Sequence, residues 1–213
     1  MRSRAGVKSA DMTRPAAVIF DLGKVLVDFD YSIAGRRIAA RARMSAGQVQ
    51  AFIGHSPLLA RFETGQINRQ QFFSEVQRAT GFQGAIGEFS AFFADIFAPI
   101  EPMVKLHAEL RKRGLPTYIF SNTNELAVDH IRGNFPFFGR FNGYVLSCEH
   151  GALKPDPALY EVVEAKTGRR GSELFYIDDR PENIETAVGR GWQVVLHESP
   201  DRTRQAIEAS LSP

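Results

Sequence analysis

The sequence contains little cysteine: Cys148 is the only one among 213 residues. A single cysteine excludes an internal disulfide and favours a reducing compartment. The N-terminal residues lack the apolar stretch of a secretory signal peptide, and no run reaches the roughly 18 apolar residues that a transmembrane helix needs. These absences predict a cytoplasmic protein with no membrane partner.

Basic patches and histidine clusters are also scarce. The formal net charge is +2 at pH 7, and residues 1–14 hold four basic residues against one acidic residue. We expect this segment to be a disordered, solvated basic leader. The rest of the chain shows no basic stripe with interleaved aromatic residues, which argues against a nucleic-acid partner. The five histidines have no spacing typical of metal ligands.

Phenylalanine, by contrast, is abundant, with 17 residues against one tryptophan. Several lie between Phe52 and Phe97, and Phe89, Phe92 and Phe93 follow a helical spacing. Apolar residues make up 44% of the chain and charged residues 23%, the balance of a globular protein. The length allows one domain with a sizeable insertion, and the phenylalanines predict an aromatic-rich core.

Five short apolar runs have the composition of buried parallel strands. They cover residues 16–20, 117–120, 144–146, 174–177 and 193–196. Helical patterns lie between them at about 102–113, 124–133, 157–167 and 182–190. Strands that alternate with helices predict an α/β fold with a doubly wound parallel sheet.

Residues 30–98 interrupt that alternation. They show helical periodicity at about 32–43, 46–53, 57–63, 69–79 and 86–97, and no strand-like run. Ser45 and Asn68 are the expected N-caps, while Gly54, Gly65 and Gly81 are expected to separate helices. We therefore predict a core built from residues 15–29 and 99–213, with residues 30–98 inserted after the first strand as an α-helical cap.

Polar residues follow the apolar runs at their carboxyl ends. In an open parallel sheet these ends meet at one edge, and ligands bind in the crevice beyond it. The residues predicted to converge there are Asp21, Ser121, Asn122, Asp178 and Asp179, with Lys154 in a Leu-Lys-Pro-Asp-Pro loop. A carboxylate, a hydroxyl, an ammonium and a carboxylate pair in one crevice form a strong site hypothesis.

The residue types indicate a chemistry for this crevice. The carboxylate of Asp21 can attack phosphorus and form an acyl-phosphate. Mg²⁺ prefers oxygen ligands and binds through carboxylates and phosphate oxygens, so Asp21 with Asp178 and Asp179 suits this ion. Lys154 places a positive charge on a transferring phosphoryl group, and Ser121 can donate a hydrogen bond to it.

Four segments resemble, in order, the motifs of the haloacid dehalogenase superfamily. They read Phe-Asp-Leu-Gly-Lys-Val-Leu-Val-Asp, Ser-Asn-Thr-Asn, Leu-Lys-Pro-Asp and Ile-Asp-Asp-Arg-Pro-Glu-Asn. The resemblance covers residues 15–198 and implies a Rossmann-like core with a helical cap. It also implies that Asp21 is the nucleophile and that the phosphate is held by Ser121, Asn122 and Lys154. The magnesium ligands implied by the resemblance are Asp21, the carbonyl of Gly23 and Asp179, with Asp178 as an accessory or water-mediated ligand.

Within that superfamily, the chain resembles bacterial sugar-phosphate phosphatases that act on α-glucose 1-phosphate. These are related to the N-terminal phosphatase domain of soluble epoxide hydrolases, and residues 62–67, Phe-Glu-Thr-Gly-Gln-Ile, are similar to a cap feature of that branch. The resemblance implies a small phosphorylated metabolite as substrate and Mg²⁺ as cofactor. The sequence leaves the oligomeric state open between a monomer and a homodimer. Cap loops around residues 54–68 are expected to read the substrate.

One position departs from the superfamily pattern. Most of its phosphatases carry a second Asp two residues after the nucleophile as general acid and base, and here that residue is Gly23. We hypothesise that the substrate has a leaving group that needs little protonation, such as the anomeric oxygen of a sugar 1-phosphate. Asp28 or Asp30, at the entry to the cap, is the alternative source of the acid.

Two other functions are compatible with the same residues. A 2-haloacid dehalogenase expels halide without protonating it, so Gly23 is no handicap there, although that chemistry does not need the magnesium that the carboxylate pair favours. A non-catalytic protein that binds a phosphate ligand is the second alternative. Within the site, Ser121 has the alternative role of capping the following helix. Asn183 is expected to order its loop rather than touch substrate.

Overall fold

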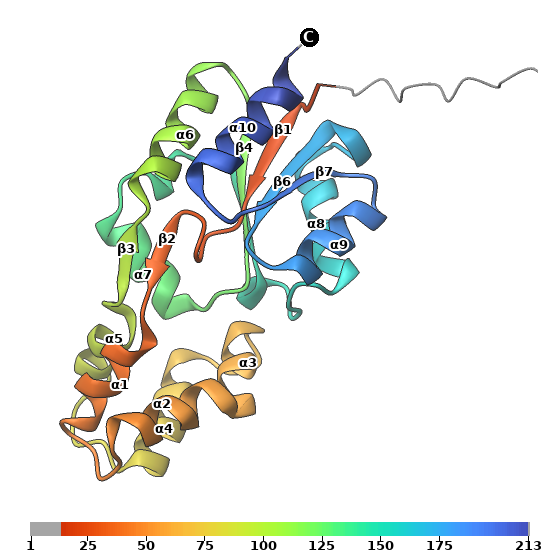
Figure 1. Cartoon of the computed structure of the whole chain (residues 1–213). Coiled ribbons are helices and arrows are strands. Elements are labelled where there is room, and N and C mark those ends of the chain that lie inside the picture. Colours follow the sequence, from red (N-terminus) through yellow and green to blue (C-terminus); the bar gives the residue numbers. More distant parts are fainter. Residues whose placement is uncertain (1–13, 213) are drawn as a thin grey trace, which may run out of the picture.

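The computed structural model describes residues 14–212, with His55 described by its backbone only. The leader expected at residues 1–14 therefore lies, except for Arg14, outside the described residues. The centre of the fold is a parallel five-stranded sheet in the order β5-β4-β1-β6-β7 (Figure 1). Its strands are β1 (Ala17–Phe20), β4 (Thr117–Ser121), β5 (Gly143–Leu146), β6 (Leu174–Asp178) and β7 (Gln193–Leu196). The predicted doubly wound parallel sheet is confirmed.

Helices cover both faces of this sheet because alternate side chains of each strand point to opposite faces. Val18 and Phe20 of β1 pack with α6 (Glu101–Lys112), α7 (Glu125–Asn134) and α10 (Pro200–Leu211). Ala17 and Ile19 pack on the other face with α8 (Pro157–Thr167) and α9 (Pro181–Gly189). Three single-turn 3₁₀ helices, η1 (Phe138–Arg140), η2 (Ser147–Glu149) and η3 (Gly171–Glu173), complete the core. None of the described helices is both long and apolar enough to cross a membrane.

The strand order reverses at β1, which lies between β4 and β6. Chain connections leave β1 toward β4 and β5 on one side, and the chain later returns to β6 and β7 on the other. Such a switch point opens a crevice beyond the carboxyl end of the central strand. Asp21 follows β1 directly at this crevice.

Five helices lie between the two strands of a small antiparallel ribbon, β2 (Val27–Phe29) and β3 (Phe97–Pro99). They are α1 (Tyr31–Ala39), α2 (Ala46–His55), α3 (Pro57–Glu63), α4 (Arg69–Thr80) and α5 (Ile86–Ala94), and they form the lower lobe in Figure 1. The expectation of no strand in residues 30–98 was wrong at its end, because β3 begins at Phe97. The two strands of this ribbon have only three residues each, too few to show an alternating pattern in the sequence.

The helix termini of this lobe follow local sequence signals. Ser45 and Asn68 cap α2 and α4 in capping boxes, as predicted, and Gly81 ends α4 with a φ of 71°. The expected break at Gly54 was wrong: Gly54 lies inside α2, and the break comes at Ser56, which caps α3. Phenylalanines fill the lobe, including Phe62, Phe72, Phe82, Phe89 and Phe93, all fully buried.

Candidate active site

Asp21 lies at the point where the central strand ends. Its backbone amide donates to the carbonyl of Ile177 on β6, at 2.9 Å, and this bond ties the start of the loop to the neighbouring strand. Its Oδ1 accepts hydrogen bonds from the amide of Leu22 at 2.7 Å and forms an ion pair with Nζ of Lys154 at 3.0 Å. Among residues 14–212, no donor contacts Oδ2 of Asp21, so this oxygen is available to a ligand.

Lys154 is buried, with 1% of its side chain exposed. Its ammonium donates to the carbonyl of Phe120 at 3.0 Å and to Oδ2 of Asp178 at 2.6 Å, in addition to its contact with Asp21. Burial alone would lower the pKa of Lys154, but the charges of Asp21 and Asp178 outweigh burial and raise it. Lys154 is therefore a permanently charged bridge between two strand ends.

Asp178 is the most enclosed carboxylate of the site and has no exposed surface. Its oxygens accept from Lys154, from the hydroxyl of Tyr176, from the amide of Arg180 at 2.8 Å and from Nδ2 of Asn183 at 3.0 and 3.1 Å. Burial alone would raise its pKa, but Lys154 and these hydrogen bonds hold the pKa below its ordinary value. The prediction that Asn183 orders this loop is confirmed by its contact with Asp178.

The carboxylate oxygens of the site are placed to bind a cation. Ligand oxygens of Asp21, Asp178 and Asp179 lie within 4.8 Å of one another, and Lys154 pairs with two of these three carboxyl groups, those of Asp21 and Asp178. Burial raises the pKa of Asp21 to about 7, with repulsion from Asp178 adding to it and Lys154 opposing it. The pKa of Asp179 is also raised by burial and by Asp178. Because a cation among such oxygens favours the charged carboxylates, the donor set suits Mg²⁺.

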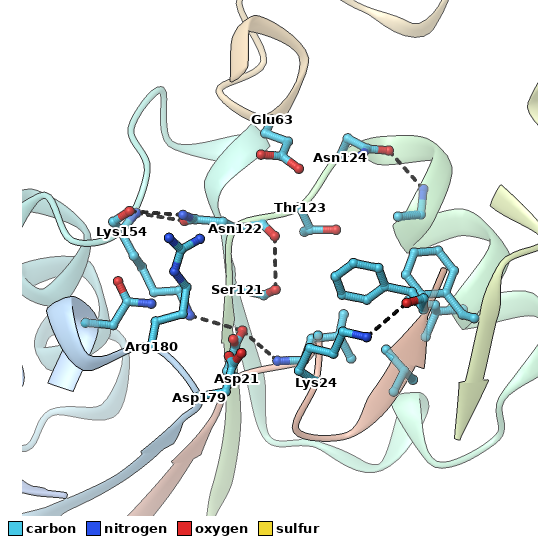
Figure 2. Close-up of a pocket in the computed structure, with 18 of the residues that line it drawn as sticks. Asp21, Lys24, Glu63, Ser121, Asn122, Thr123, Asn124, Lys154, Asp179 and Arg180 are labelled. Atoms are coloured by element: carbon cyan, nitrogen blue, oxygen red, sulfur yellow. Dashed lines mark hydrogen bonds and ion pairs between the residues drawn. The ribbon is translucent and has the colours of Figure 1, made fainter. Parts of the chain in front are cut away.

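Ser121 and Asn122 follow β4 on the other side of β1. Ser121 is buried, and its hydroxyl donates to the carbonyl of Asn122 at 3.3 Å. It does not cap the next helix, because the N-cap of α7 is Asn124. The side chain of Asn122 exchanges two hydrogen bonds with the backbone of Lys154, at 2.7 and 3.0 Å, and so holds the lysine loop against β4 (Figure 2).

These groups border one cavity of about 320 Å³ between the core and the five-helix lobe. Its polar lining consists of Asp21, Lys24, Glu63, Ser121, Asn122, Thr123, Asn124, Lys154, Asp179, Arg180 and Asn183. Its apolar lining consists of Leu22, Val27, Phe29, Tyr31, Leu59, Phe97, Ala127 and Ile131. All predicted site residues, including Gly23, line the cavity, with the exception of Asp178. Asp178 is fully buried next to Lys154. Leu59 and Glu63 enter from the 54–68 segment.

Gly23 has a steric reason to lack a side chain. A Cβ atom at this position would lie 2.9 Å from the ring of Phe29, closer than real Cβ contacts come. Phe29 itself belongs to β2 and packs edge-on against Tyr31 and Phe97 at the cavity wall. The ring therefore occupies the place where an acidic side chain of residue 23 would begin.

Asp28 and Asp30, the alternative acids, do not line the cavity. Asp28 is exposed and pairs with Lys24, and Asp30 caps α1 by accepting from the amide of Ser32 at 2.8 Å. Hydrogen bonds from Lys24 and from Ser32 lower the pKa of Asp28 and of Asp30, respectively. Both are therefore ionised and turned to other partners, and the structure contradicts their use as the acid.

Sequence reasoning missed two residues of this site. Tyr176 sits inside β6 and reads as an ordinary core residue, yet its hydroxyl contacts both Lys154 and Asp178. Glu63 lies at the end of α3, and Figure 2 shows its carboxyl group pointing from the lobe into the cavity above Ser121 and Thr123. The signal for Glu63 was its place in the Phe-Glu-Thr-Gly-Gln-Ile segment, which the resemblance singled out.

Two curated relatives match most of the chain. Acyl-CoA dehydrogenase family member 10 of Mus musculus is 27% identical over 207 residues, which is 92% of this chain. The match spans only 19% of the length of that mouse protein. Sesquiterpene phosphatase astK of Aspergillus oryzae is 26% identical over 184 residues, covering 85% of this chain and 88% of the relative.

A solved structure shares the fold. The HAD family enzyme bt-2542 of Bacteroides thetaiotaomicron, in complex with magnesium and inorganic phosphate, superimposes with a TM-score of 0.77 at 21% identity. The alignment covers 85% of this chain and 93% of that enzyme. The family model of the haloacid dehalogenase-like hydrolases matches residues 15–189, and this span includes the cavity lining and the strands that position it. This chain belongs to the haloacid dehalogenase-like hydrolase family.

Proposed function

We propose that this protein is a magnesium-dependent phosphatase that hydrolyses a small phosphorylated metabolite through an aspartyl-phosphate on Asp21. The proposal is supported above all by one observation: Asp21, Lys154 and two further carboxylates converge at the carboxyl end of β1, beside a single cavity. A carboxylate next to a fixed ammonium is suited to attack a dianionic phosphate, because the ammonium offsets their mutual repulsion.

Each residue has a defined task in this proposal. Oδ2 of Asp21 attacks phosphorus while Oδ1 stays fixed by Leu22 and Lys154. Lys154 and the hydroxyl of Ser121 bind the phosphoryl oxygens, and the side chain of Asn122 holds the Lys154 loop while its backbone faces the phosphate. Water then hydrolyses the aspartyl-phosphate and regenerates the Asp21 carboxylate.

Magnesium would be held by Asp21, the carbonyl of Gly23 and Asp179. Asp178 would act as an accessory or water-mediated ligand, because its oxygens already accept from donors of the protein. When bound, the ion neutralises charge on the phosphoryl group. Asp178 also supports the site by fixing the ammonium of Lys154.

Two classes of phosphate ester are each favoured by a different feature of the cavity. A sugar 1-phosphate is favoured by Gly23, because its anomeric oxygen leaves with little need for a proton. The phosphate of an apolar alcohol is favoured by the apolar part of the lining, to which Val27, Phe29, Leu59 and Ile131 contribute. The name of the Aspergillus oryzae relative, a sesquiterpene phosphatase, supports this second class.

The test is phosphate release from p-nitrophenyl phosphate and from a panel containing both substrate classes. We expect release that stops on addition of EDTA, returns with Mg²⁺, and is absent in Asp21→Asn but normal in Asp201→Asn, a change at an exposed position of α10. Chloride release from 2-chloropropionate that EDTA leaves unchanged would instead establish a dehalogenase. Magnesium-dependent binding of a phosphate ester without any release would establish a binding protein.

A further inference from the structure

We propose that Glu63, supplied by the helical lobe, is the general acid and base that the loop at Gly23 cannot provide. This inference rests on the proposed phosphatase function and adds a catalytic residue to it. It also names the substrate class that needs this residue, namely phosphate esters of ordinary alcohols, whose leaving oxygen must receive a proton.

The first support is the position of the Glu63 carboxyl group. It lines the same cavity as Asp21, Ser121 and Lys154, and it enters from the opposite side (Figure 2). Within the described part of the chain, no hydrogen bond or ion pair engages its side chain. A partly buried carboxyl group without a protein partner, aimed into a site, is free to contact a substrate oxygen.

The second support is that the backbone of Glu63 is fastened to the core. The hydroxyl of Ser147, just after β5, donates to the carbonyl of Glu63 at 2.6 Å. The same hydroxyl accepts from the amide of Thr123 at 2.9 Å, and Thr123 lines the cavity. One buried serine therefore connects the turn that carries Glu63 to the loop that follows β4.

Gly65 allows this turn to lie directly on the core. Its φ is +67°, and a Cβ atom there would lie 2.2 Å from the carbonyl oxygen of Cys148. Farther along, Arg69 at the start of α4 pairs with Glu125 and Asp129 on α7. These contacts flank Glu63 and hold it at a fixed place over the cavity, as a catalytic group requires.

The surroundings keep a proton on Glu63 near neutral pH. Burial raises its pKa to about 7, and the positive charge of Arg180 opposes the shift. Tyr31 on α1 and Cys148 on η2 also lie within electrostatic reach of Glu63. The other charged groups lining the cavity are Asp21, Lys24, Lys154 and Asp179. A general acid works best when its pKa lies near the working pH.

The proton balance closes over the two chemical steps. In the first, Oδ2 of Asp21 forms a bond to phosphorus, the bond from phosphorus to the alcohol oxygen breaks, and the proton of Glu63 joins that oxygen. In the second, water attacks phosphorus, the bond to Asp21 breaks, and the Glu63 carboxylate takes a proton from the water. Alcohol and phosphate leave, and both carboxyl groups return to their starting states.

The test compares wild type with Glu63→Gln on two substrates, one whose leaving group needs a proton and one whose leaving group does not. p-Nitrophenolate leaves without a proton, whereas the alkoxide of an alkyl phosphate such as butyl phosphate needs one. The matched control is Glu75→Gln, because Glu75 lies on α4 of the same lobe, pairs with Arg61 and does not line this cavity. Circular dichroism and the affinity for inorganic phosphate in magnesium verify that each variant keeps its fold and its phosphate site.

We expect Glu63→Gln to lower kcat/KM for butyl phosphate by about 10²–10³-fold. For p-nitrophenyl phosphate, kcat/KM stays within about threefold because formation of the aspartyl-phosphate needs no acid. Its kcat falls and a burst of p-nitrophenolate appears, since hydrolysis of the intermediate loses its base. The decline of wild-type kcat/KM for butyl phosphate above about pH 7 disappears in Glu63→Gln, and Glu75→Gln behaves as wild type throughout.

Equal losses on both substrates, or none on either, would overturn the role of Glu63 while leaving the phosphatase function intact. Wild type that releases no phosphate from any ester would overturn the proposed function and this inference with it. Glu63→Asp provides a further check: a shorter carboxyl group should restore part of the butyl phosphate activity, and Glu63→Ala should restore none.

Discussion

The ionisable groups on the two sides of the cavity differ in their bonded partners. We call these two sides the floor and the roof. The floor, which we define as Asp21, Lys154 and Asp178 at the strand ends, pairs its ammonium with carboxylates at 2.6 and 3.0 Å. The roof, which we define as Glu63 at the end of α3, offers a carboxyl group that has no bonded partner among the residues that the structure describes. The floor residues are buried and Glu63 is partly buried, and the two regions differ above all in whether their charged groups have bonded partners.

This difference shows how partners decide protonation. Lys154 and Asp178 keep each other charged, with the pKa of the lysine raised and that of the aspartate lowered. Glu63 has burial without a bonded partner, and its pKa rises to about 7. Asp21 lies between the two cases, since burial raises its pKa to about 7 although Lys154 contacts it. The floor is therefore built to hold charge, and the roof to hold a proton.

The largest effect is expected from breaking the floor. Lys154→Met removes the ammonium and leaves two buried carboxylates facing each other, which we expect to cost about 3–5 kcal/mol of unfolding free energy. Phosphatase activity should fall by more than about 100-fold. Urea unfolding and kcat/KM measure the two effects, with Lys166→Met as the exposed control. Unfolding free energies that are equal in the two variants would contradict the account of the floor.

Replacing Glu63 in the roof is expected to raise the unfolding free energy, whereas replacing Lys154 in the floor lowers it. Glu63 has a folded pKa of about 7 against an ordinary 4.5, so the folded protein binds the extra proton and is destabilised as pH rises through this interval. Glu63→Gln removes that loss. At pH 8 the variant should be more stable than wild type by roughly 3 kcal/mol, and at pH 4.5 about equal to it.

Unfolding free energies of wild type and Glu63→Gln, measured from pH 4.5 to 8, check this prediction. Glu75→Gln should follow the wild-type curve, because the ion pair that Glu75 forms with Arg61 is partly exposed to solvent and contributes little. A difference between Glu63→Gln and wild type that does not grow with pH would contradict the burial of a protonated Glu63.

A smaller loss of stability is expected at Gly65, where the turn after Glu63 contacts the core. Gly65→Ala introduces a Cβ against the carbonyl of Cys148 and a strained positive φ, which together should cost about 1–3 kcal/mol. By displacing Glu63, it should also lower kcat/KM for an alkyl phosphate more than for p-nitrophenyl phosphate. Gly87→Ala on α5, where a Cβ meets open space, should leave both measurements near wild type.

The smallest loss of stability is expected from the ion pairs between Arg69 on α4 and α7. Arg69→Gln removes the guanidinium contacts with Glu125 and Asp129, whose side chains are more than a third exposed, while the hydrogen bond from the backbone amide of residue 69 to Glu125 stays. Exposed pairs contribute little, so we expect a loss below about 1 kcal/mol that shrinks as salt is added. Thermal unfolding at low and high ionic strength measures it, and a loss that salt leaves unchanged would contradict a purely electrostatic contact.

The floor could be predicted from sequence because it follows from strand order. Asp21, Ser121 and Asp178 each stand at or directly after the end of a recognisable apolar run, and parallel strands bring such ends together. Lys154 was placed by its loop and by the resemblance. What the sequence did not show was Tyr176, because its hydroxyl acts from inside a strand that reads as apolar core.

The roof could not be predicted in the same way, because it depends on docking between distant segments. Glu63 meets the core through Ser147, 84 residues later in the chain. The ring that a Cβ at Gly23 would meet comes from Phe29, on a ribbon whose second strand begins at Phe97. By contrast, α10 was missed although Ser199 and Pro200 mark its start by ordinary capping rules.

During turnover, Asp21 is proposed to carry the phosphoryl group. Rapid mixing with p-nitrophenyl phosphate and magnesium, acid quenching and peptide mass spectrometry measure it directly. We expect one phosphoryl group on the peptide containing Asp21, at higher occupancy in Glu63→Gln than in wild type, and none in Asp21→Asn. A phosphoryl group on another residue, or undiminished turnover by Asp21→Asn, would contradict this role of Asp21.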